Sequence, residues 1–209
     1  MKLVQRISWV ALFAVAMALV EACVVVYLRR TYYPEGFTFP LHPTESAAVA
    51  AEIGREIATL IMLLAVGILA GKSRRERLAY AGLAFGIWDL FYYLWLKLLI
   101  GWPASLFDWD VLFLIPWPWI GPVIAPCAIA VVLIVLCLLV LLSEARGQSF
   151  KLSVRGWLLI VFGTLVLLFS FLRDLDASLH FRAPQPYWYP LLVLGLACYI
   201  LAFLKRLSF

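Results

Sequence analysis

Charged residues are scarce in this chain, and their scarcity excludes an ordinary soluble domain. Asp, Glu, Lys and Arg make up 14% of its 209 residues, whereas hydrophobic residues make up 66%. Soluble domains average about 25% charged and about 45–50% apolar residues. A mean hydropathy of +1.01 agrees with this difference. The composition therefore predicts an integral membrane protein.

Histidine and cysteine are also rare, which argues against most metal and redox chemistry. The two histidines, His42 and His180, fall in predicted loops, so the facing imidazoles of a bis-His haem are missing. The Glu-x-x-His motif of di-iron bundles is missing too. The four cysteines lie in apolar segments without CxxC spacing, which is typical of small packing residues. No phosphate loop, nucleophile elbow or dinucleotide fingerprint occurs, and we expect neither a metal nor a cofactor.

Long apolar runs are abundant, and they predict six membrane-spanning helices. Each run has roughly 17 to 24 residues, which is enough to cross a hydrocarbon core of about 30 Å. None alternates in the manner of an outer-membrane barrel. The expected fold class is an all-α integral membrane protein, a six-transmembrane-helix bundle that forms a single domain over residues 1–209. Its predicted spans are 7–27, 47–70, 78–100, 120–142, 156–172 and 187–204.

Basic residues are scarce on one side of these spans, and this asymmetry predicts the orientation. The amino-terminal end, the second and fourth loops and the carboxy-terminal tail hold 11 of the 17 Lys and Arg residues. By the positive-inside rule both termini are cytoplasmic, although Arg29 and Arg30 oppose the rule locally. The net charge of +5 follows from this orientation and indicates no nucleic-acid partner. We expect a multi-pass protein of a bacterial inner membrane, surrounded by membrane lipid.

The two long outer loops are rich in proline, and the second is also rich in tryptophan. Residues 28–46 predict an irregular, partly extended cap. Residues 104–113, in the middle of the next outer loop, predict either a short helix in the interface, where tryptophan prefers to lie, or a re-entrant element. Aromatic residues in such loops also suit an interface with another protein.

Two glycine pairs in GxxxG spacing predict close helix contacts. Gly67 and Gly71 lie in the second span, and Gly82 and Gly86 lie in the third. Such pairs let helix backbones approach closely. Gly67 lies about 20° around the helix from Glu56. We therefore expect these two spans to pack at their glycines and to part toward the outer side.

Acidic residues are missing from the inner halves of the spans but not from the outer halves. Glu21, Glu52, Glu56 and Asp89 fall at predicted membrane depth, where ionisable groups are costly and often functional. Counted from the outer ends of their spans, Glu56 and Asp89 lie roughly 14 and 16 Å deep. Only one base, Arg55, lies as deep. Surplus buried acids imply protonated carboxyls, a bound cation or a water-filled cavity.

Side chains around these acids complete the candidate site. Tyr93 follows Asp89 by four residues and Lys97 follows Tyr93 by four, so the three share one helix face. Pro126, four residues after Pro122, predicts backbone carbonyls left unpaired toward a cavity. The candidate acid–base residues are Asp89, Glu56, Glu52 and Arg55. The expected ligand-binding residues are Glu21, Trp88, Tyr92, Tyr93, Lys97 and Pro126.

Two interpretations of this cluster stay open. In one, a protonated Asp89 donates a proton to a small or lipid-like ligand, while a carboxylate that Arg55 holds ionised accepts one. In the other, Arg55 bridges Glu52 or Asp89, and the cluster only sets the helix register.

Three functions follow from these features, and whether the protein is an enzyme stays open. The first is binding or acid–base chemistry on a small or lipid-like ligand in an acidic pocket of the outer, periplasmic half. The second is a non-catalytic subunit whose outer loops dock a membrane or periplasmic protein. The third is a proton- or cation-coupled transporter. Transport is the least favoured, because inner segments such as 62–69 and 131–142 contain no ionisable residue.

Overall fold

Helices dominate the computed structural model, which describes residues 2–41 and 45–207. The chain is 72% helical, and five of the described helices are long and apolar enough to cross a membrane. This confirms the prediction of an all-α membrane bundle. The last helix has a shorter apolar stretch, Tyr189–Leu204, so the count of six spans stays a prediction. The elements are α1 (Leu3–Tyr32), α2 (Ser46–Ala70), α3 (Arg74–Ile100), β1 (Trp109–Phe113), β2 (Trp119–Pro122), α4 (Ile124–Ala145), α5 (Val154–Leu172), α6 (Leu175–Leu179) and α7 (Tyr189–Leu207).

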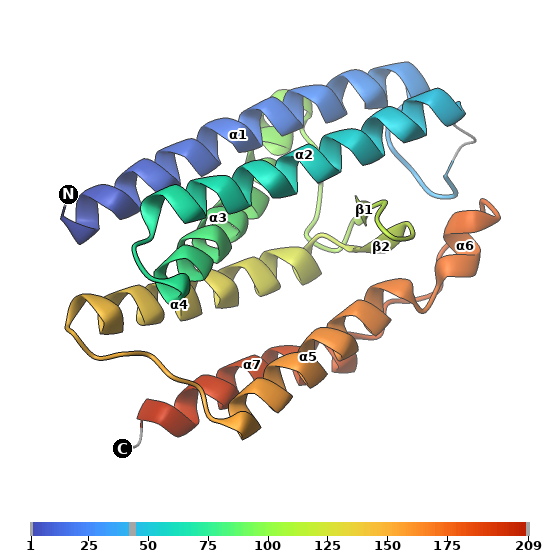
Figure 1. The fold of residues 1–209 in the computed structure, drawn as a ribbon. Coiled ribbons are helices and arrows are strands. Elements are labelled where there is room, and N and C mark those ends of the chain that lie inside the picture. The colour runs from blue at the N-terminus through green and yellow to red at the C-terminus, as the bar shows by residue number, and fades with distance from the viewer. Residues whose placement is uncertain (1, 42–44, 208–209) are drawn as a thin grey trace.

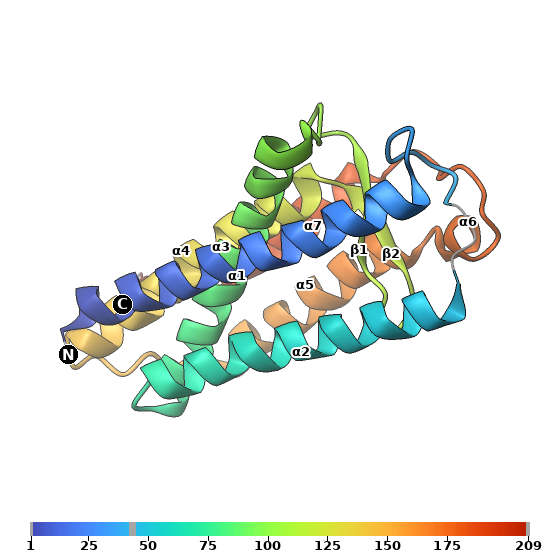
Figure 2. The same cartoon turned by 90° about the horizontal axis from the view of Figure 1, so that it is seen from above.

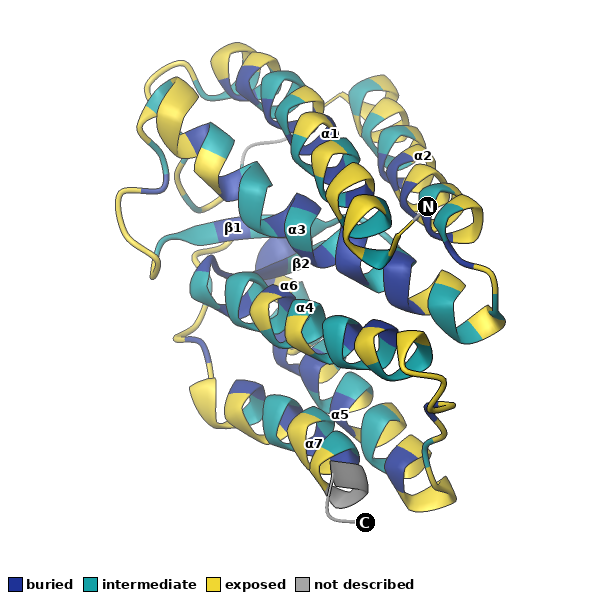
Figure 3. Ribbon diagram, turned by 90° about the vertical axis from the view of Figure 1, so that its left-hand side faces the viewer, coloured by how far each residue is buried: buried dark blue, intermediate teal, exposed yellow. Residues whose placement is uncertain are grey.

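The bundle is arranged around α3. This helix contacts α1, α2 and α4, whereas α5 and α7 pair with each other on the far side of α4 (Figure 3). The start of α1 and the end of α7 lie at one end of the bundle, together with the connections α2–α3 and α4–α5 (Figure 1). We call this the inner end, and we call the opposite end, which carries α6, the outer end.

The outside of the bundle is apolar, as a surface in contact with lipid requires. Ile61, Leu69, Val154 and Leu158 are each more than half exposed. Apolar patches of this kind mark contact with membranes or partners rather than with water. The core lies between α1, α3 and α4, where the fully buried residues Ala14, Ala18, Tyr80 and Ala84 lie.

Glycines let α3 approach two different helices. A Cβ on Gly67 would lie 2.6 Å from the Cβ of Ala81, so α2 and α3 meet there as predicted. A Cβ on Gly86 would lie 2.9 Å from the carbonyl oxygen of Ala130, and one on Gly82 would lie 2.7 Å from a sulfur of α4. The second glycine pair therefore packs on α4 and not on α2.

The second outer loop contains a β-hairpin. Strand β1 pairs antiparallel with β2, with Trp109 opposite Pro122 and Phe113 opposite Trp119. The predicted interface helix over 104–113 is therefore wrong, and the helix of the predicted span 120–142 begins only at Ile124. The hairpin crosses beneath the outer halves of α1 and α2, on the side of α4 (Figures 1 and 2). Backbone of this kind is tolerated within a membrane protein where protein surrounds it.

The first turn of α4 corrects the role predicted for Pro126. Pro126 is the third residue of α4, and amides of a first turn have no partner within the helix in any case. Its missing N–H therefore interrupts no helical hydrogen bond. The amides of Val123 and Ile124 donate to loop carbonyls of Asp108 and Leu106, at 2.9 and 2.8 Å. Contrary to the prediction, Pro126 therefore does not leave backbone carbonyls of the helix unpaired.

Candidate functional site

A cavity of about 510 Å³ lies at the outer side of the bundle. Its wall comes from α1, the first outer loop, α2, α3, the β-hairpin, α4, the end of α5 and the segment around α6. Aromatic and aliphatic side chains form most of this wall. Seven charged side chains reach it: the acids Glu21, Glu52, Glu56, Asp89 and Asp110, and the bases Arg29 and Arg55.

Arg55 joins α1 to α2 across the cavity. Its guanidinium forms ion pairs with Glu21 of α1 and with Glu52, where the NH2–Oε2 distance is 2.8 Å. The hydroxyl of Thr59 donates to Glu21 from the next turn of α2. Because α1 and α2 share few other contacts, this network sets the width of the space between them. Arg55 bridges Glu52, as the structural interpretation expects, but its second partner is Glu21 and not Asp89.

Glu56 anchors the tip of the β-hairpin. The amide of Leu114 donates to both of its carboxylate oxygens, at 3.0 and 2.9 Å. A backbone N–H is one of the groups that stabilise an ionised carboxylate. The chain itself therefore supplies the hydrogen-bond partner of the Glu56 carboxylate. The hairpin tip lies at the level of Glu56, which the sequence predicts to be deep in the membrane.

A second ion pair, which the sequence did not predict, closes the wall beside α1. Arg29 NH2 lies 2.9 Å from Asp110 Oδ1, and both residues are buried. The guanidinium carbon lies 3.7 Å from the ring centre of Trp102 and 4.3 Å from that of Phe37. Burial raises the pKa of Asp110, and the adjacent Arg29 guanidinium opposes that rise.

Arg29 belongs to α1 because this helix continues to Tyr32, whereas the sequence predicted loop from residue 28. Its conflict with the positive-inside rule was the signal that could have revealed a buried partner. Asp110 was harder to identify as the partner of Arg29, since the sequence places it in a tryptophan-rich loop.

Asp89 differs from every other acid of the cavity. It is 9% exposed and lines the cavity from α3. Among the described residues its carboxyl group has neither a hydrogen bond nor an ion pair. The bridge from Arg55 to Asp89, one alternative predicted from the sequence, does not form. A buried carboxyl without a partner is costly, so this position calls for an explanation beyond stability.

Aromatic rings form a continuous wall next to Asp89. Trp88 stacks on Tyr92 with ring centres 6.3 Å apart, and Trp88 also lies 6.3 Å from Phe113 of the hairpin. Phe113 in turn lies 5.7 Å from Trp119. The wall thus runs from α3 onto both strands, and its ring faces and edges border the cavity.

Most of the residues predicted for the site meet in this cavity. It is lined by Glu21, Glu52, Arg55, Glu56, Trp88, Asp89, Tyr92, Tyr93 and Pro126. Lys97 is not among the lining residues. Its ammonium donates to the carbonyls of Gly101 and Pro103, at 3.1 and 2.8 Å. It therefore completes the carboxy-terminal end of α3, a common role for lysine.

His180 does not line the cavity. His180 is exposed and pairs with Asp176 at 2.8 Å, and His42 lies outside the described residues. Within residues 2–41 and 45–207, no group of three or more His, Cys, Asp or Glu side chains is placed to hold a metal ion.

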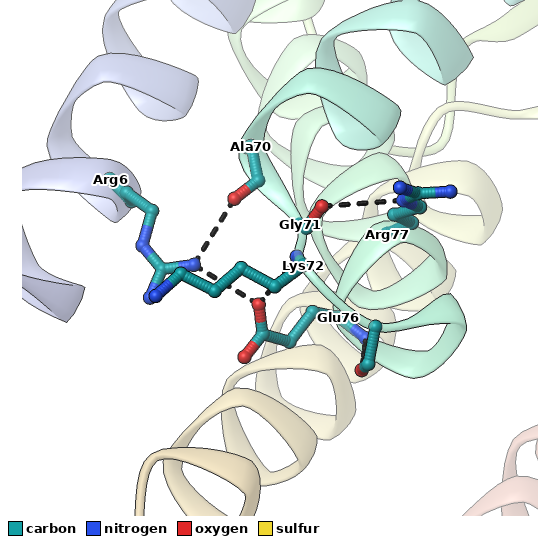
Figure 4. Close-up of polar contacts among 7 residues, drawn as sticks. Arg6, Ala70, Gly71, Lys72, Glu76 and Arg77 are labelled. Carbon is teal, nitrogen blue, oxygen red and sulfur yellow. Dashed lines mark hydrogen bonds and ion pairs between the residues drawn. The ribbon is translucent and has the colours of Figure 1, made fainter. Parts of the chain in front are cut away.

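The inner end of the bundle is closed by polar contacts of a different kind. Arg6 of α1 donates to Glu76 at 3.0 Å and to the carbonyl of Ala70 at 3.2 Å (Figure 4). Arg77 donates to the carbonyl of Gly71 at 3.3 Å in the same group. These contacts join α1, α2 and α3, and the carboxylate of Glu76 is paired with the guanidinium of Arg6.

Comparison with known proteins gives no relative from which a role can be transferred. No protein-family model, no curated protein and no solved structure matches the chain.

Proposed function

We propose that this chain is a six-span inner-membrane protein, with both termini cytoplasmic, whose outer cavity binds a small or lipid-like ligand. The volume of about 510 Å³ falls within the range of about 300–1,000 Å³ that ligand sites occupy. Mostly apolar walls with a few converging polar groups are the usual composition of such sites. The basic loops of the inner end support the orientation.

The observation that carries this proposal is the unpartnered carboxyl of Asp89. The chain itself supplies partners for the other four acids of the cavity, through Arg55, Arg29 and the amide of Leu114. Among the described residues, Asp89 is the one acid of the cavity wall with no partner on either carboxyl oxygen. It can accept a hydrogen bond from a ligand, or take up and return a proton, which is the acid–base role expected of it.

Docking of a partner protein is the second candidate. Its support is the exposure of Leu106, Phe107 and Trp117 in the second outer loop. Large apolar side chains exposed together are typical of contact surfaces. Transport has less support, because ion pairs and a tightly packed core occupy the inner end.

The proposal can be tested with photoreactive alkyl probes in liposomes that contain the purified protein. Each probe carries a diazirine on its alkyl chain, and mass spectrometry locates the adducts. A ligand cavity predicts adducts on its interior wall, for example on residues 111–114, in addition to those on lipid-facing helices. Adducts restricted to lipid-facing residues would contradict the proposal.

A matched pair of variants on α4 sharpens the experiment. Ile129 lines the cavity, whereas Val131 is 50% exposed on the outside of the same helix. Ile129→Trp fills the cavity and should remove the interior adducts. Val131→Trp adds the same ring outside and should preserve them. Equal interior labelling of the two variants would refute a binding role for the cavity.

A further inference from the structure

The cavity wall already holds one organic cation, which belongs to the chain itself. The guanidinium of Arg29 lies between the carboxylate of Asp110 and the rings of Trp102 and Phe37. A carboxylate on one side and ring faces on the others is how proteins hold organic cations in general. The chain therefore shows within this cavity how a positive group is bound.

Asp89 has similar surroundings without the cation. Trp88 precedes it, and Tyr92 and Tyr93 follow on the same face of α3, three and four residues later. All four residues line the cavity, and Trp88 and Tyr92 stack on each other. The carboxyl is nine-tenths buried and has no partner among the described residues. A buried carboxyl on a cavity wall that aromatic side chains also line is half of a cation site.

The charged groups of the cavity wall also favour a positively charged occupant. Five acids and two arginines reach its wall. With every group ionised, the wall would therefore carry a clear negative excess. Buried charges are stable when an opposite charge and hydrogen bonds compensate them. A positively charged ligand supplies that compensation without proton uptake by the protein.

We infer that the ligand is an amphiphilic organic cation, a primary amine or quaternary ammonium with an apolar tail. This inference rests on the proposed function, since it names the chemical class of the ligand. The charged head lies beside Asp89, covered by Trp88 and Tyr92, and the tail follows the apolar wall toward Phe113 and Trp119. A hard metal ion fits less well, because it needs several converging oxygen ligands, and the described residues offer no such group.

The test compares photoreactive probes that share one alkyl tail and differ only in their head group. The heads are a primary ammonium, a trimethylammonium, a hydroxyl and a carboxylate. In the unmodified protein, interior labelling by both ammonium probes should exceed that by the hydroxyl probe by about tenfold or more. This is the effect of one hydrogen bond or contact to a charged group. The carboxylate probe should label the interior least.

Asp89→Asn removes the charge and keeps the shape of the side chain. It should reduce ammonium labelling to the level of the hydroxyl probe, and continued interior labelling by the hydroxyl probe reports an intact cavity. Asp89→Glu should restore part of the preference for ammonium. Should Asp89→Asn fail to fold, the head-group ranking in the unmodified protein still decides the inference.

Each outcome separates the inference from the proposed function. Hydroxyl and ammonium probes that label the interior equally, with both blocked by Ile129→Trp, would overturn the cationic ligand and leave the cavity a binding site. A preference for ammonium that persists in Asp89→Asn would also overturn the inference. Interior labelling that Ile129→Trp does not change would overturn the proposed function itself.

Discussion

The two ends of this bundle treat buried charge in opposite ways. At the inner end acids meet bases: Arg6 pairs with Glu76, and Arg75 pairs with Glu144 at 3.2 Å. At the outer end five acids and two bases line a cavity, and one acid has no partner among the described residues. Both regions contain acids and arginines, so residue type alone does not say which acids are paired.

The difference lies in what each arrangement can do. Paired charges join helices and close the space between them, because a buried charge is tolerated when its partner is near. The inner contacts of Arg6 tie α1 to the α2–α3 connection in this way. An unpartnered carboxyl on a cavity wall contributes nothing to such closure. The position of this carboxyl is better explained by a ligand that pairs with it.

The largest effect should come from breaking the Arg29–Asp110 ion pair at the outer end, both partners of which are buried. Arg29→Ala leaves Asp110, which is 2% exposed, without its cation. We expect a loss of about 3–5 kcal/mol in the free energy of unfolding, because an uncompensated buried charge is costly. Denaturant unfolding in mixed micelles measures it. Replacing both residues by leucine should recover most of the loss, and failure to do so would point to the rings of Trp102 and Phe37 instead.

A smaller effect should follow from forcing the inner helices apart. A Cβ on Gly67 would lie 2.6 Å from both the Cβ and the backbone N of Ala81. Gly67→Ala should therefore lower the free energy of unfolding by about 1–3 kcal/mol. Gly54→Ala, on the same helix with no heavy atom within 4 Å of the new Cβ, is the matched control. It should raise stability by up to about 1 kcal/mol through helix propensity, and equal losses would contradict a close α2–α3 contact.

Weakening the Arg6–Glu76 ion pair at the inner end should lower the free energy of unfolding by less than Gly67→Ala does. Glu76 accepts from Arg6 at 3.0 Å and from the amide of Lys72 at 2.8 Å. Glu76→Gln keeps one acceptor and removes the charge, so we expect a loss of about 1 kcal/mol. The same unfolding assay applies, and Arg6→Gln should give a similar value. A double variant whose loss equals the sum of the two would show that the pair is not coupled.

The smallest effect on stability should come from Asp89→Asn at the outer end. No pairing is lost, and a neutral amide is easier to bury than a carboxylate. The free energy of unfolding should stay within about 0.5 kcal/mol or rise, while ammonium labelling falls. A loss comparable to that of Arg29→Ala would give Asp89 a structural role and remove the contrast between the two ends.

Part of the candidate site was predictable because depth and helix face are local properties. A rise of about 1.5 Å per residue predicts similar depths for Glu56 and Asp89, and both line the cavity. Helical spacing placed Asp89 with Tyr93, and both line the cavity. Lys97 follows the same spacing, yet it turns to the carbonyls at the end of its own helix. Spacing gives a side chain its face but not the direction in which a long, flexible side chain extends.

The hairpin shows where local rules failed. A run of tryptophan and apolar residues at 109–113 is compatible with an interface helix and with a strand. Pairing with Trp119–Pro122 decides between them, and that pairing depends on how residues 114–118 turn. Its tip binds Glu56 from a helix far away in the sequence. No local pattern contains such a contact.

The sequence by itself determined that this protein is a helical membrane bundle whose acids gather toward one side, because run length, hydropathy and helical rise are properties of single segments. Only the tertiary structure decided which acids are paired. Arg55 reaches Glu21 and Glu52, Arg29 reaches Asp110, and Asp89 is left to the cavity. These choices depend on how the helices rotate and how far apart they lie, since an ion pair forms only where two side chains from different segments meet within a few ångströms.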